Sequence, residues 1–315
     1  MTSAAVADTR AARVRALVWE ADDVLAVELV GVDGPLPAWQ PGAHIDLVVP
    51  GAPVRQYSLS GRPDAASYRV AVLREADSRG GSRAVHERLR PGDVVEVRGP
   101  RNHFALEPAG EYLFIAGGIG VTPLLPMVRE AADRGIPWRM LYLGSARRRM
   151  PFVDELASIP GGELTIVAAD EAPRADLAAV VAEHPAAAVY ACGPERMLHA
   201  LSELLPEEDG RLRLEYFSAP AVEYEPGGPF RVQLARTGVE ITVEPDQSVL
   251  AAMREVGVDV LSDCEEGICG SCETHVLDGD VEHRDFVLTA QEKAAGDCMM
   301  VCVSRAACPL LVLDA

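Results

Sequence analysis

The stretch Cys264-Glu265-Glu266-Gly267-Ile268-Cys269-Gly270-Ser271-Cys272 contains three cysteines with four and then two residues between them, and Cys302 follows further along the chain. In a chain without an export signal, cysteines clustered in this way are expected to be metal ligands rather than disulfides. The spacing matches the C-x4-C-x2-C…C pattern of plant-type [2Fe–2S] sites. We therefore predict that Cys264, Cys269, Cys272 and Cys302 bind such a cluster.

Two alternatives to this ligand set stay open. A structural zinc site usually takes two pairs of ligands, each separated by two to four residues, and one such pair is well formed in this region. Cys298 and Cys308 lie close to Cys302 and compete with it as fourth ligand, although the spacing favours Cys302 and the other two are expected to be small core residues. Gly267 and Gly270 lack a Cβ, so we expect backbone N–H groups to turn toward the sulfur atoms there.

Composition limits the classes of partner. The chain has 315 residues, enough for two or three domains, and a formal net charge of −19, which argues against nucleic acid or an anionic membrane as a partner. From Pro226 onward the chain contains sixteen acidic and six basic residues. This excess of negative charge either steers a basic protein partner or simply keeps the surface soluble. The sequence shows neither an apolar run of membrane-span length nor a secretory signal in its first fifteen residues, so we expect a cytoplasmic protein without a membrane partner.

The length and spacing of the apolar runs divide the chain into regions. Up to Gly99, short strand-like runs separated by turns predict an antiparallel barrel or sandwich. From Glu111 onward, apolar strands alternate with helix-length segments, which predicts a doubly wound α/β domain. A linker is expected over 219–229. Strands are predicted at 14–18, 24–29, 44–49, 56–60, 68–73, 94–97, 112–116, 140–143, 164–168, 188–191, 231–234 and 239–243, and helices at 84–89, 123–133, 152–157, 175–182, 194–205 and 249–256.

Two turns of the α/β region are predicted to bind a nucleotide. Gly117-Gly118-Ile119-Gly120-Val121-Thr122-Pro123 follows a strand and opens a helix, whose N-terminus favours phosphate. Cys192-Gly193-Pro194 does the same after a later strand, so both turns are expected at the carboxyl edge of one parallel sheet. We expect Gly118, Gly120 and Gly193 to line the site and Cys192 to neighbour the nicotinamide ring. Taken alone, the first turn is also typical of a plain tight turn, and Cys192 of a small buried residue.

A second pair of motifs indicates a flavin. Arg55-Gln56-Tyr57-Ser58-Leu59-Ser60 lies on an expected barrel strand, where Arg55 can pair with a phosphate and Tyr57 can pack against an isoalloxazine ring. Arg79-Gly80-Gly81-Ser82 precedes an expected helix, so Ser82 is predicted to be its N-cap, with neighbouring amides that hold a terminal phosphate. Each motif alone is typical of ordinary packing or an ordinary turn, and their order along the chain is the informative feature.

With these motifs assembled, the chain resembles the reductase components of the phthalate dioxygenase and vanillate demethylase type over nearly its whole length. Beyond the motifs above, the resemblance is carried by Gly99-Pro100-Arg101-Asn102-His103-Phe104, Glu215-Tyr216-Phe217, His283-Arg284-Asp285 and Val301-Cys302-Val303-Ser304-Arg305-Ala306. It implies a multidomain protein with an FMN-binding antiparallel β-barrel over 1–107, an NAD(P)-binding doubly wound α/β domain over 108–221, and a β-grasp plant-type ferredoxin domain with the [2Fe–2S] cluster over 222–315.

The resemblance also implies site residues. Thr122 would lie near the flavin or the nicotinamide, and Phe217 would cover the isoalloxazine unless it is an ordinary core aromatic. The residues implied to bind FMN are Arg55, Tyr57, Ser58, Leu59, Gly80, Gly81 and Ser82. The cradle for a terminal phosphate favours FMN over FAD. The family commonly uses NADH, whereas the adjacent arginines Arg147, Arg148 and Arg149 either hold the 2′-phosphate of NADPH or form a solvated loop.

The activity implied by the resemblance is that of an oxygenase reductase. Electrons would pass from NADH or NADPH through FMN and the cluster to a terminal acceptor, either a Rieske-type oxygenase or a cytochrome P450. The cofactors carry the reaction, so no side chain has to act as a catalytic acid or base. The alternatives are an electron-transfer subunit of a larger complex without independent NAD(P)H oxidation, against which the two complete turns weigh, and a structural module that holds zinc.

Overall fold

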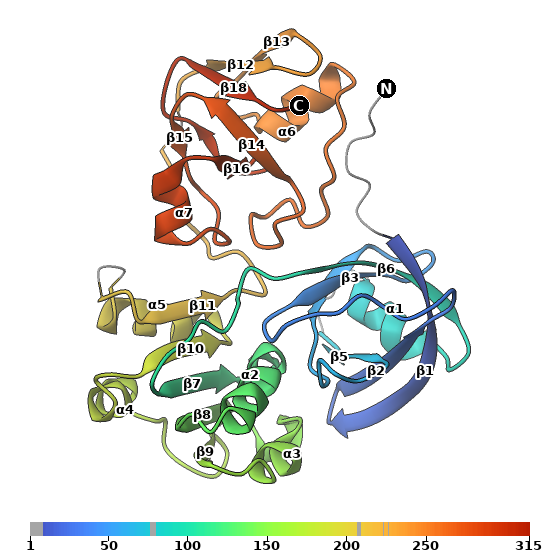
Figure 1. Ribbon diagram of the computed structural model, residues 1–315, viewed down its shortest axis with the longest axis vertical. Coiled ribbons are helices and arrows are strands. Elements are labelled where there is room, and N and C mark those ends of the chain that lie inside the picture. Colours follow the sequence, from blue (N-terminus) through green and yellow to red (C-terminus); the bar gives the residue numbers. More distant parts are fainter. Residues whose placement is uncertain (1–8, 76–79, 207–208, 223, 226) are drawn as a thin grey trace. The chain divides into compact units, whose positions relative to one another are not determined.

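The computed structural model describes residues 9–75, 80–206, 209–222, 224–225 and 227–315, which form two compact units (Figure 1). The first unit spans Asp8–Phe217, and the second contains Ser218–Ala315. Within the described ranges, none of the helices combines the length and the apolar character that crossing a membrane requires.

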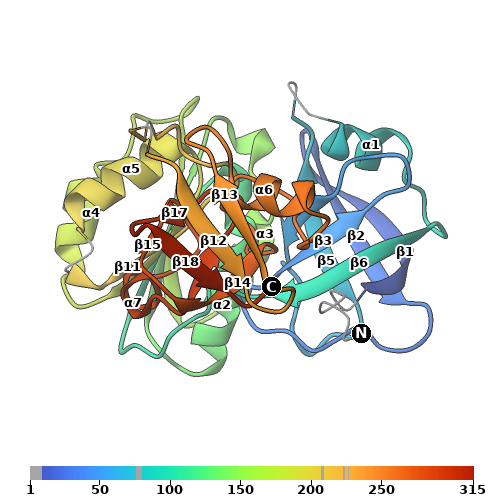
Figure 2. The ribbon, with the colours of Figure 1, turned by 90° about the horizontal axis from the view of Figure 1, so that it is seen from above.

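The first unit begins with a closed antiparallel sheet of six strands in the order β4-β3-β6-β1-β2-β5. A bridge between Leu59 and Val70 joins the two edge strands, so the sheet closes into the predicted barrel. Alternating side chains fill its interior, and the short helix α1 covers one end of it (Figure 2). The elements are β1 (Thr9–Ala21), β2 (Val24–Gly31), β3 (His44–Val48), β4 (Arg55–Ser58), β5 (Tyr68–Leu73), α1 (Gly81–Glu87) and β6 (Val94–Arg101).

The rest of the first unit is a five-stranded parallel sheet in the order β11-β10-β7-β8-β9, with helices between successive strands. Its strands are β7 (Tyr112–Gly117), β8 (Trp138–Gly144), β9 (Gly162–Ala168), β10 (Ala188–Cys192) and β11 (Leu212–Glu215). Its helices are α2 (Val121–Asp133), α3 (Val153–Ala157), α4 (Leu177–Glu183) and α5 (Glu195–Leu204), with the 3-10 turns η1 (Gly118–Gly120) and η2 (Arg147–Arg149).

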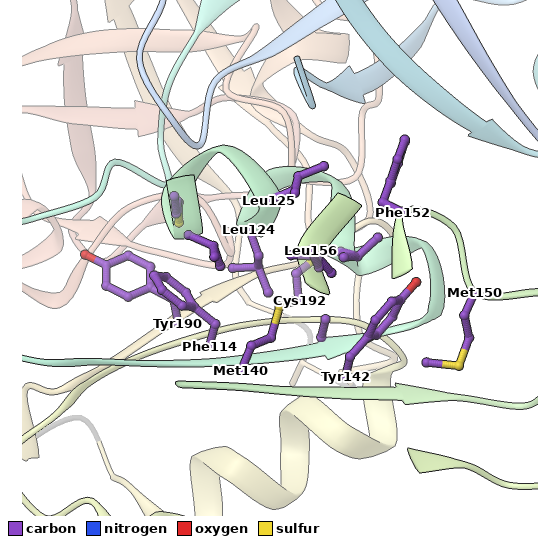
Figure 3. Packing of buried hydrophobic residues seen from close by; sticks show 14 of the residues in the cluster. Phe114, Leu124, Leu125, Met140, Tyr142, Met150, Phe152, Leu156, Tyr190 and Cys192 are labelled. Carbon is purple, nitrogen blue, oxygen red and sulfur yellow. The ribbon is translucent and has the colours of Figure 1, made fainter. Parts of the chain in front are cut away.

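Strand β7 lies at the centre of this sheet and is buried on both faces, which explains its unbroken apolar sequence. Phe114 packs with Leu124 and Leu125 of α2 on one face (Figure 3). Ile115 packs with Leu201 of α5 on the other face. Helices therefore cover both faces, as the doubly wound pattern predicted.

The second unit is built on a five-stranded sheet in the order β13-β12-β18-β14-β16. The hairpin of β12 and β13 leads into helix α6, and the C-terminal strand β18 returns parallel to β12, an arrangement typical of a β-grasp fold. The elements are β12 (Phe230–Leu234), β13 (Val239–Val243), α6 (Val249–Glu255), β14 (Glu273–Asp278), β15 (Val281–Glu282), α7 (Ala290–Ala295), β16 (Cys298–Met300), β17 (Arg305–Ala306) and β18 (Leu310–Leu313).

Each predicted strand and helix coincides with an observed one, although β1 runs from Thr9 to Ala21 rather than over 14–18. The prediction of Ser82 as an N-cap is wrong. Helix α1 begins two residues earlier than this prediction implies, because Gly80 adopts a φ of 110° and takes the N-cap position, which places the buried Ser82 in the first turn. The sequence pattern does not predict strand β11 or the elements after α6, and the expected domain boundaries after residues 107 and 221 stay predictions.

Arg305 provides a test of the second unit. Its side chain is buried and donates to three carbonyl oxygens, those of Gln247 at 2.8 Å, Gly228 at 3.2 Å and Glu244 at 3.2 Å. Arg305→Ala would leave these acceptors without their donor, so we expect the free energy of unfolding of this unit to fall by about 3 kcal/mol. Urea unfolding followed by circular dichroism measures the change.

Arg231→Ala is the matched control for this prediction. Arg231 lies on β12 of the same unit and pairs with Glu240 at 3.0 Å, but both side chains are exposed. Its removal should cost about 0.5 kcal/mol or less. Equal effects of the two substitutions would contradict a supporting role for buried Arg305.

Candidate functional site

The order of the parallel sheet creates a switch point between β7 and β10, where ligands of doubly wound folds bind. The two predicted nucleotide turns follow these two strands. The register pairs Ala116 with Cys192 and Cys192 with Glu215, so the carboxyl ends of β7, β10 and β11 lie level with one another. The structure thus brings the two turns together as the sequence predicted.

Glycines allow the two turns to touch through their backbones. A Cβ on Gly193 would lie 2.8 Å from the Cα of Gly117, and a Cβ on Gly120 would lie 2.2 Å from the carbonyl oxygen of Cys192. Gly118, in contrast, has a φ of +55° and open space beside its Cα. Gly117, Gly120 and Gly193 therefore serve close packing, and Gly118 is the position where a bound group can approach the backbone.

Thr122 and Cys192 are both buried beneath the turns. The hydroxyl of Thr122 donates to the carbonyl of Ile119 at 2.9 Å and so braces the turn from which α2 starts. Cys192 belongs to the hydrophobic core under α2 (Figure 3), and burial, followed by the charge of Glu215, raises the pKa of its thiol. The thiol therefore stays protonated. That either residue neighbours the nicotinamide stays a prediction.

The predicted flavin strand β4 lies against the start of α1. A Cβ on Gly81 would lie 2.5 Å from the Cγ of Arg55, so the arginine side chain crosses directly over this glycine. The hydroxyl of Ser82 accepts a hydrogen bond from the backbone N–H of Glu75 at 3.4 Å. The strand and the Gly80–Ser82 turn are therefore neighbours, which a shared phosphate ligand requires.

Tyr57 and Leu59 differ in their suitability for a cofactor. Tyr57 is partly buried against the barrel core, and burial raises the pKa of its phenol to about 12, which keeps it neutral. Leu59 is fully buried in that core, and its backbone N–H donates to Ala43 at 2.8 Å. Leu59 thus has a structural task in the barrel, whereas Tyr57 is only partly buried.

Glu215 is a site residue that the sequence reasoning missed. Its Oε2 accepts a hydrogen bond from the hydroxyl of Ser58 at 3.5 Å and so joins β11 to the flavin strand. Burial raises the pKa of Glu215 to about 8, and the hydrogen bond from Ser58 opposes this shift. The Glu215-Tyr216-Phe217 motif is part of the family resemblance, but its place at the sheet edge depends on β11, which the sequence pattern does not predict. Phe217 is 44% exposed, so it is not the ordinary core aromatic of the alternative interpretation.

The three arginines after β8 are all paired with carboxylates. Arg147 lies 3.2 Å from Glu171, which follows β9, while Arg148 and Arg149 lie 3.2 and 3.1 Å from Asp22 and Asp23. The last two pairs join the α/β part to the turn between β1 and β2 of the barrel. These side chains therefore have acidic partners while all three remain exposed to solvent.

The four predicted cluster ligands form two thiol pairs in the second unit. Cys264 hydrogen-bonds with Cys269, which lowers the pKa of Cys264 to about 6, and Cys272 hydrogen-bonds with Cys302. Two pairs of thiolates are what a two-iron cluster requires. Across the described segments, no set of three or more His, Cys, Asp or Glu side chains is arranged to hold a single metal ion.

Backbone donors surround these sulfur atoms. The N–H of Glu266 donates to the Sγ of Cys264 at 3.3 Å, and the N–H of Gly267 donates to Cys302. Gly267 has a φ of +72°, and a Cβ there would lie 2.7 Å from Val303. The donor set and the glycine cradle thus fit an iron–sulfur cluster, whose sulfur atoms accept such hydrogen bonds.

Asp285 lies in a short segment that contacts both loops that carry the thiols. Its Oδ2 accepts hydrogen bonds from the backbone N–H groups of Val287 at 3.2 Å and Leu288 at 2.9 Å, and its Oδ1 accepts one from Ser304 at 3.4 Å. The N–H of the next residue, Phe286, donates to the carbonyl of Gly267 at 2.9 Å. The Asp285 carboxylate therefore fastens its own segment to the loop of Cys302, and the backbone of Phe286 joins that segment to the loop of the first three cysteines.

The two remaining cysteines of this region occupy structural positions. Cys298 lies on β16 opposite His275, and burial raises the pKa of its thiol to about 11. Cys308 donates to the carbonyl of Leu310 at 3.0 Å and accepts from the N–H of Asp280 at 3.2 Å. Neither thiol takes part in the two pairs, and the choice of Cys302 as fourth ligand stays a prediction.

The sequence of the chain is similar to those of known proteins. The 2Fe–2S iron–sulfur cluster binding domain family matches residues 232–307. The chain is 44% identical to the phenoxybenzoate dioxygenase subunit beta of Ectopseudomonas oleovorans, with all of both chains covered. It is 40% identical to the vanillate O-demethylase oxidoreductase of Pseudomonas sp. (strain HR199 / DSM 7063), with 93% of this chain and 96% of the relative covered.

Solved structures agree with these matches. An intact type IV self-sufficient cytochrome P450 monooxygenase matches with a TM-score of 0.93 and 43% identity over all of this chain, which spans 43% of that longer protein. Phthalate dioxygenase reductase, described as a modular structure for electron transfer from pyridine nucleotides to [2Fe–2S], matches with a TM-score of 0.68 and 34% identity over 98% of both chains. The chain therefore belongs to the family of oxygenase reductases that includes phthalate dioxygenase reductase and vanillate O-demethylase oxidoreductase.

Proposed function

We propose that this chain is the reductase component of an oxygenase system, which takes electrons from NADH through a flavin to a [2Fe–2S] cluster and delivers them to a terminal oxygenase. The observation that carries the proposal is the contact between Glu215 at the nucleotide edge and Ser58 on the flavin strand, in a chain that also holds two thiol pairs. A bound flavin supplies the exchange between a hydride and single electrons, and a bound cluster carries one electron at a time.

The flavin in this proposal is FMN, with FAD as the alternative. Arg55 crosses over Gly81, so its guanidinium and the first amides of α1 can hold one terminal phosphate together. Tyr57 would pack against the ring system, and Ser58 would present its hydroxyl beside Glu215. Phe217 follows β11 with an exposed ring, which is available to cover the isoalloxazine.

The nucleotide in this proposal is NADH rather than NADPH. Glu171 lies after β9 and pairs with Arg147, so a 2′-phosphate would have to displace this carboxylate from the arginine. A carboxylate at such an edge accepts a hydrogen bond from the ribose 2′-hydroxyl and repels a 2′-phosphate. Gly118, with open space beside its Cα, would let the dinucleotide approach the backbone of the turn.

The terminal acceptor in this proposal is a Rieske-type oxygenase or a cytochrome P450. The names of the relatives describe dioxygenase and demethylase systems, and the P450 monooxygenase that matches contains a similar segment within one longer chain. An electron-transfer subunit without its own NADH oxidation is the alternative, and the complete turns at the switch point weigh against it. The cytoplasmic location stays a prediction.

Two measurements on the purified full-length protein test this function. Its visible spectrum should contain flavin and iron–sulfur absorption, and NADH should support steady reduction of cytochrome c, a one-electron acceptor. A colourless protein would contradict both cofactor assignments. A coloured protein that NADH does not reduce would support the subunit alternative instead.

Glu215 predicts a pH dependence of flavin reduction. Because the pKa of its carboxyl is raised to about 8, Glu215 is neutral below this pH and becomes negative above it. The new charge beside Ser58 opposes the delivery of a hydride, so the limiting rate of flavin reduction should fall as the pH rises through about 8. Rapid-mixing experiments with NADH at different pH values measure this rate, and Glu215→Gln should abolish the fall. A fall that persists in Glu215→Gln would show that another group is responsible.

The position of Glu171 predicts that the protein prefers NADH to NADPH. We expect kcat/KM for NADH to exceed that for NADPH by about tenfold or more. Glu171→Gln removes a negative charge and frees Arg147, so it should raise kcat/KM for NADPH several-fold. Steady-state kinetics with both nucleotides checks this, with Glu163→Gln on β9 as a control, since Glu163 is exposed and pairs with Arg139 instead. A tenfold preference of the wild type for NADPH would overturn the assignment.

The hydrogen bonds that Asp285 accepts predict that this residue helps to retain the cluster. Asp285→Ala removes the acceptor shared by Val287, Leu288 and Ser304, so the segment that contacts the loop of the first three cysteines is no longer fastened to the loop of Cys302. We expect the visible absorption of the cluster to decay faster on heating, while the flavin content stays unchanged. Asp278→Ala, on the exposed end of β14, is the control and should decay like the wild type. Equal decay in Asp285→Ala and the wild type would contradict this anchoring role.

A further inference from the structure

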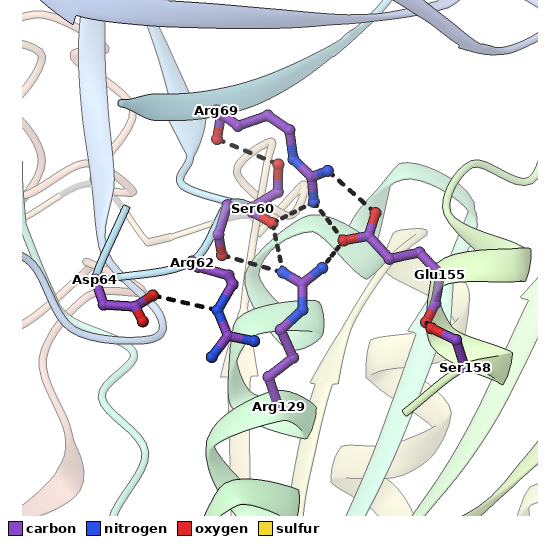
Figure 4. A network of polar contacts seen from close by, with 8 residues as sticks. Ser60, Arg62, Asp64, Arg69, Arg129, Glu155 and Ser158 are labelled. Atoms are coloured by element: carbon purple, nitrogen blue, oxygen red, sulfur yellow. Dashed lines mark hydrogen bonds and ion pairs between the residues drawn. The ribbon is translucent and has the colours of Figure 1, made fainter. Parts of the chain in front are cut away.

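Three charged side chains meet at the boundary between the barrel and the α/β part of the first unit (Figure 4). Arg69 comes from β5 of the barrel, whereas Arg129 comes from α2 and Glu155 from α3. Their side chains are 19%, 13% and 28% exposed, so all three are largely shielded from water. Interactions between charges are weakened less by salt in such a place than on the surface.

Glu155 bridges the two arginines. Arg69 donates through both terminal nitrogens, at 2.9 Å to Oε1 and at 3.1 Å to Oε2, which is the forked geometry of a strong arginine–carboxylate pair. Arg129 pairs with the same Oε1. The guanidinium of Arg69 also lies 4.7 Å above the ring of Phe152, next to α3. One carboxylate therefore connects β5 of the barrel with α2 and α3.

Both arginines also hold the backbone where the flavin strand ends. Arg69 donates to the carbonyl of Ser60 at 2.7 Å, and Arg129 donates to the same carbonyl at 3.3 Å and to that of Gly61 at 3.2 Å. Ser60 follows β4 by two residues, and its own N–H donates to the carbonyl of Arg69 at 2.8 Å. The end of β4 is thus fixed by side chains from both parts of the unit.

Helix α2 carries this constraint to the nucleotide turn. It starts at Val121, directly after the glycine turn, and Arg129 lies about two turns further along. We propose that Arg69, Arg129 and Glu155 are positioning residues, which set the distance and angle at which the nicotinamide meets the flavin by locking α2 onto the end of β4. This inference rests on the proposed function.

The charges explain why Glu155 is the key member. Burial, together with the charges of Arg69 and Arg62, lowers the pKa of Arg129 to about 10, so this cation is already disfavoured in its surroundings. Without Glu155, two shielded guanidinium groups would face each other without their shared counter-ion. Their repulsion would act directly on Ser60 and α2, and hydride transfer is sensitive to displacements of about 1 Å.

Other ion pairs across the same boundary are more exposed. Arg148 with Asp22 and Arg149 with Asp23 have side chains that are 43% to 70% exposed. Exposed pairs of this kind contribute little to stability. The network around Glu155 is therefore the better choice for a test of positioning.

The test uses Glu155→Gln in the full-length protein, mixed rapidly with NADH under anaerobic conditions. We expect the limiting rate of flavin reduction at saturating NADH to fall about tenfold or more, while the flavin content per chain and the Kd for NADH stay at wild-type values. Glu155→Asp keeps the charge and should recover part of the rate. Glu163→Gln removes an exposed carboxylate that pairs with Arg139 within the α/β part and should behave like the wild type.

The outcomes separate this inference from the proposed function. A wild type that NADH does not reduce would overturn the proposed function and this inference with it. A wild type that is reduced, with an unchanged limiting rate in Glu155→Gln or an equal loss in Glu163→Gln, would overturn the inference alone. If Glu155→Gln does not retain flavin, Arg129→Lys takes its place, because it keeps the charge and loses the bonds to Ser60 and Gly61. A wild-type rate in Arg129→Lys would then overturn the inference.

Discussion

Backbone contact between Gly117 and Gly193 sets the spacing of the nucleotide edge. No side chain separates the two turns, because a Cβ on Gly193 would lie 2.8 Å from the Cα of Gly117. The contact brings the carboxyl ends of β7 and β10 together, and the parallel register then places Glu215 of β11 level with Cys192. Glu215 in turn reaches Ser58 on β4. A continuous series of contacts therefore runs from the nucleotide turn to the flavin strand.

Charge is used differently in the two units. At the boundary between the barrel and the α/β part, arginines are matched with carboxylates, and the partly buried Arg69, Arg129 and Glu155 connect three elements. Around the thiols of the second unit, uncharged backbone N–H groups approach the sulfur atoms instead, as Glu266 and Gly267 do. Ion pairs hold the larger elements together, and backbone dipoles surround the redox centre without adding net charge to it.

Features set by local sequence were predictable. The cysteine spacing and the two glycine turns depend on a few consecutive residues, and the structure forms the two thiol pairs and brings the turns together. The proximity of Arg55 and Gly81 also agrees with the motifs, although the N-cap does not, because a positive φ at Gly80 cannot be read from a Gly-Gly-Ser sequence.

Features set by tertiary packing were not predictable from the motifs. Glu215 and Ser58 are 157 residues apart in sequence, and Arg69 and Glu155 are 86 apart, so no local pattern links them. The run of arginines at 147–149 suggested a phosphate site, but its meaning depends on Asp22, Asp23 and Glu171, which approach from other elements. The pKa of Glu215 likewise depends on burial that only the folded chain creates.

In the proposed function, one chain passes electrons from NADH through its flavin to its own cluster. Anaerobic mixing of the oxidised full-length protein with NADH, followed at flavin and iron–sulfur wavelengths, tests it most directly. The flavin absorption is expected to bleach first, and the cluster absorption is then expected to bleach within the same turnover. Bleaching of the flavin while the cluster stays oxidised, or no bleaching of either, would contradict this path of electron transfer.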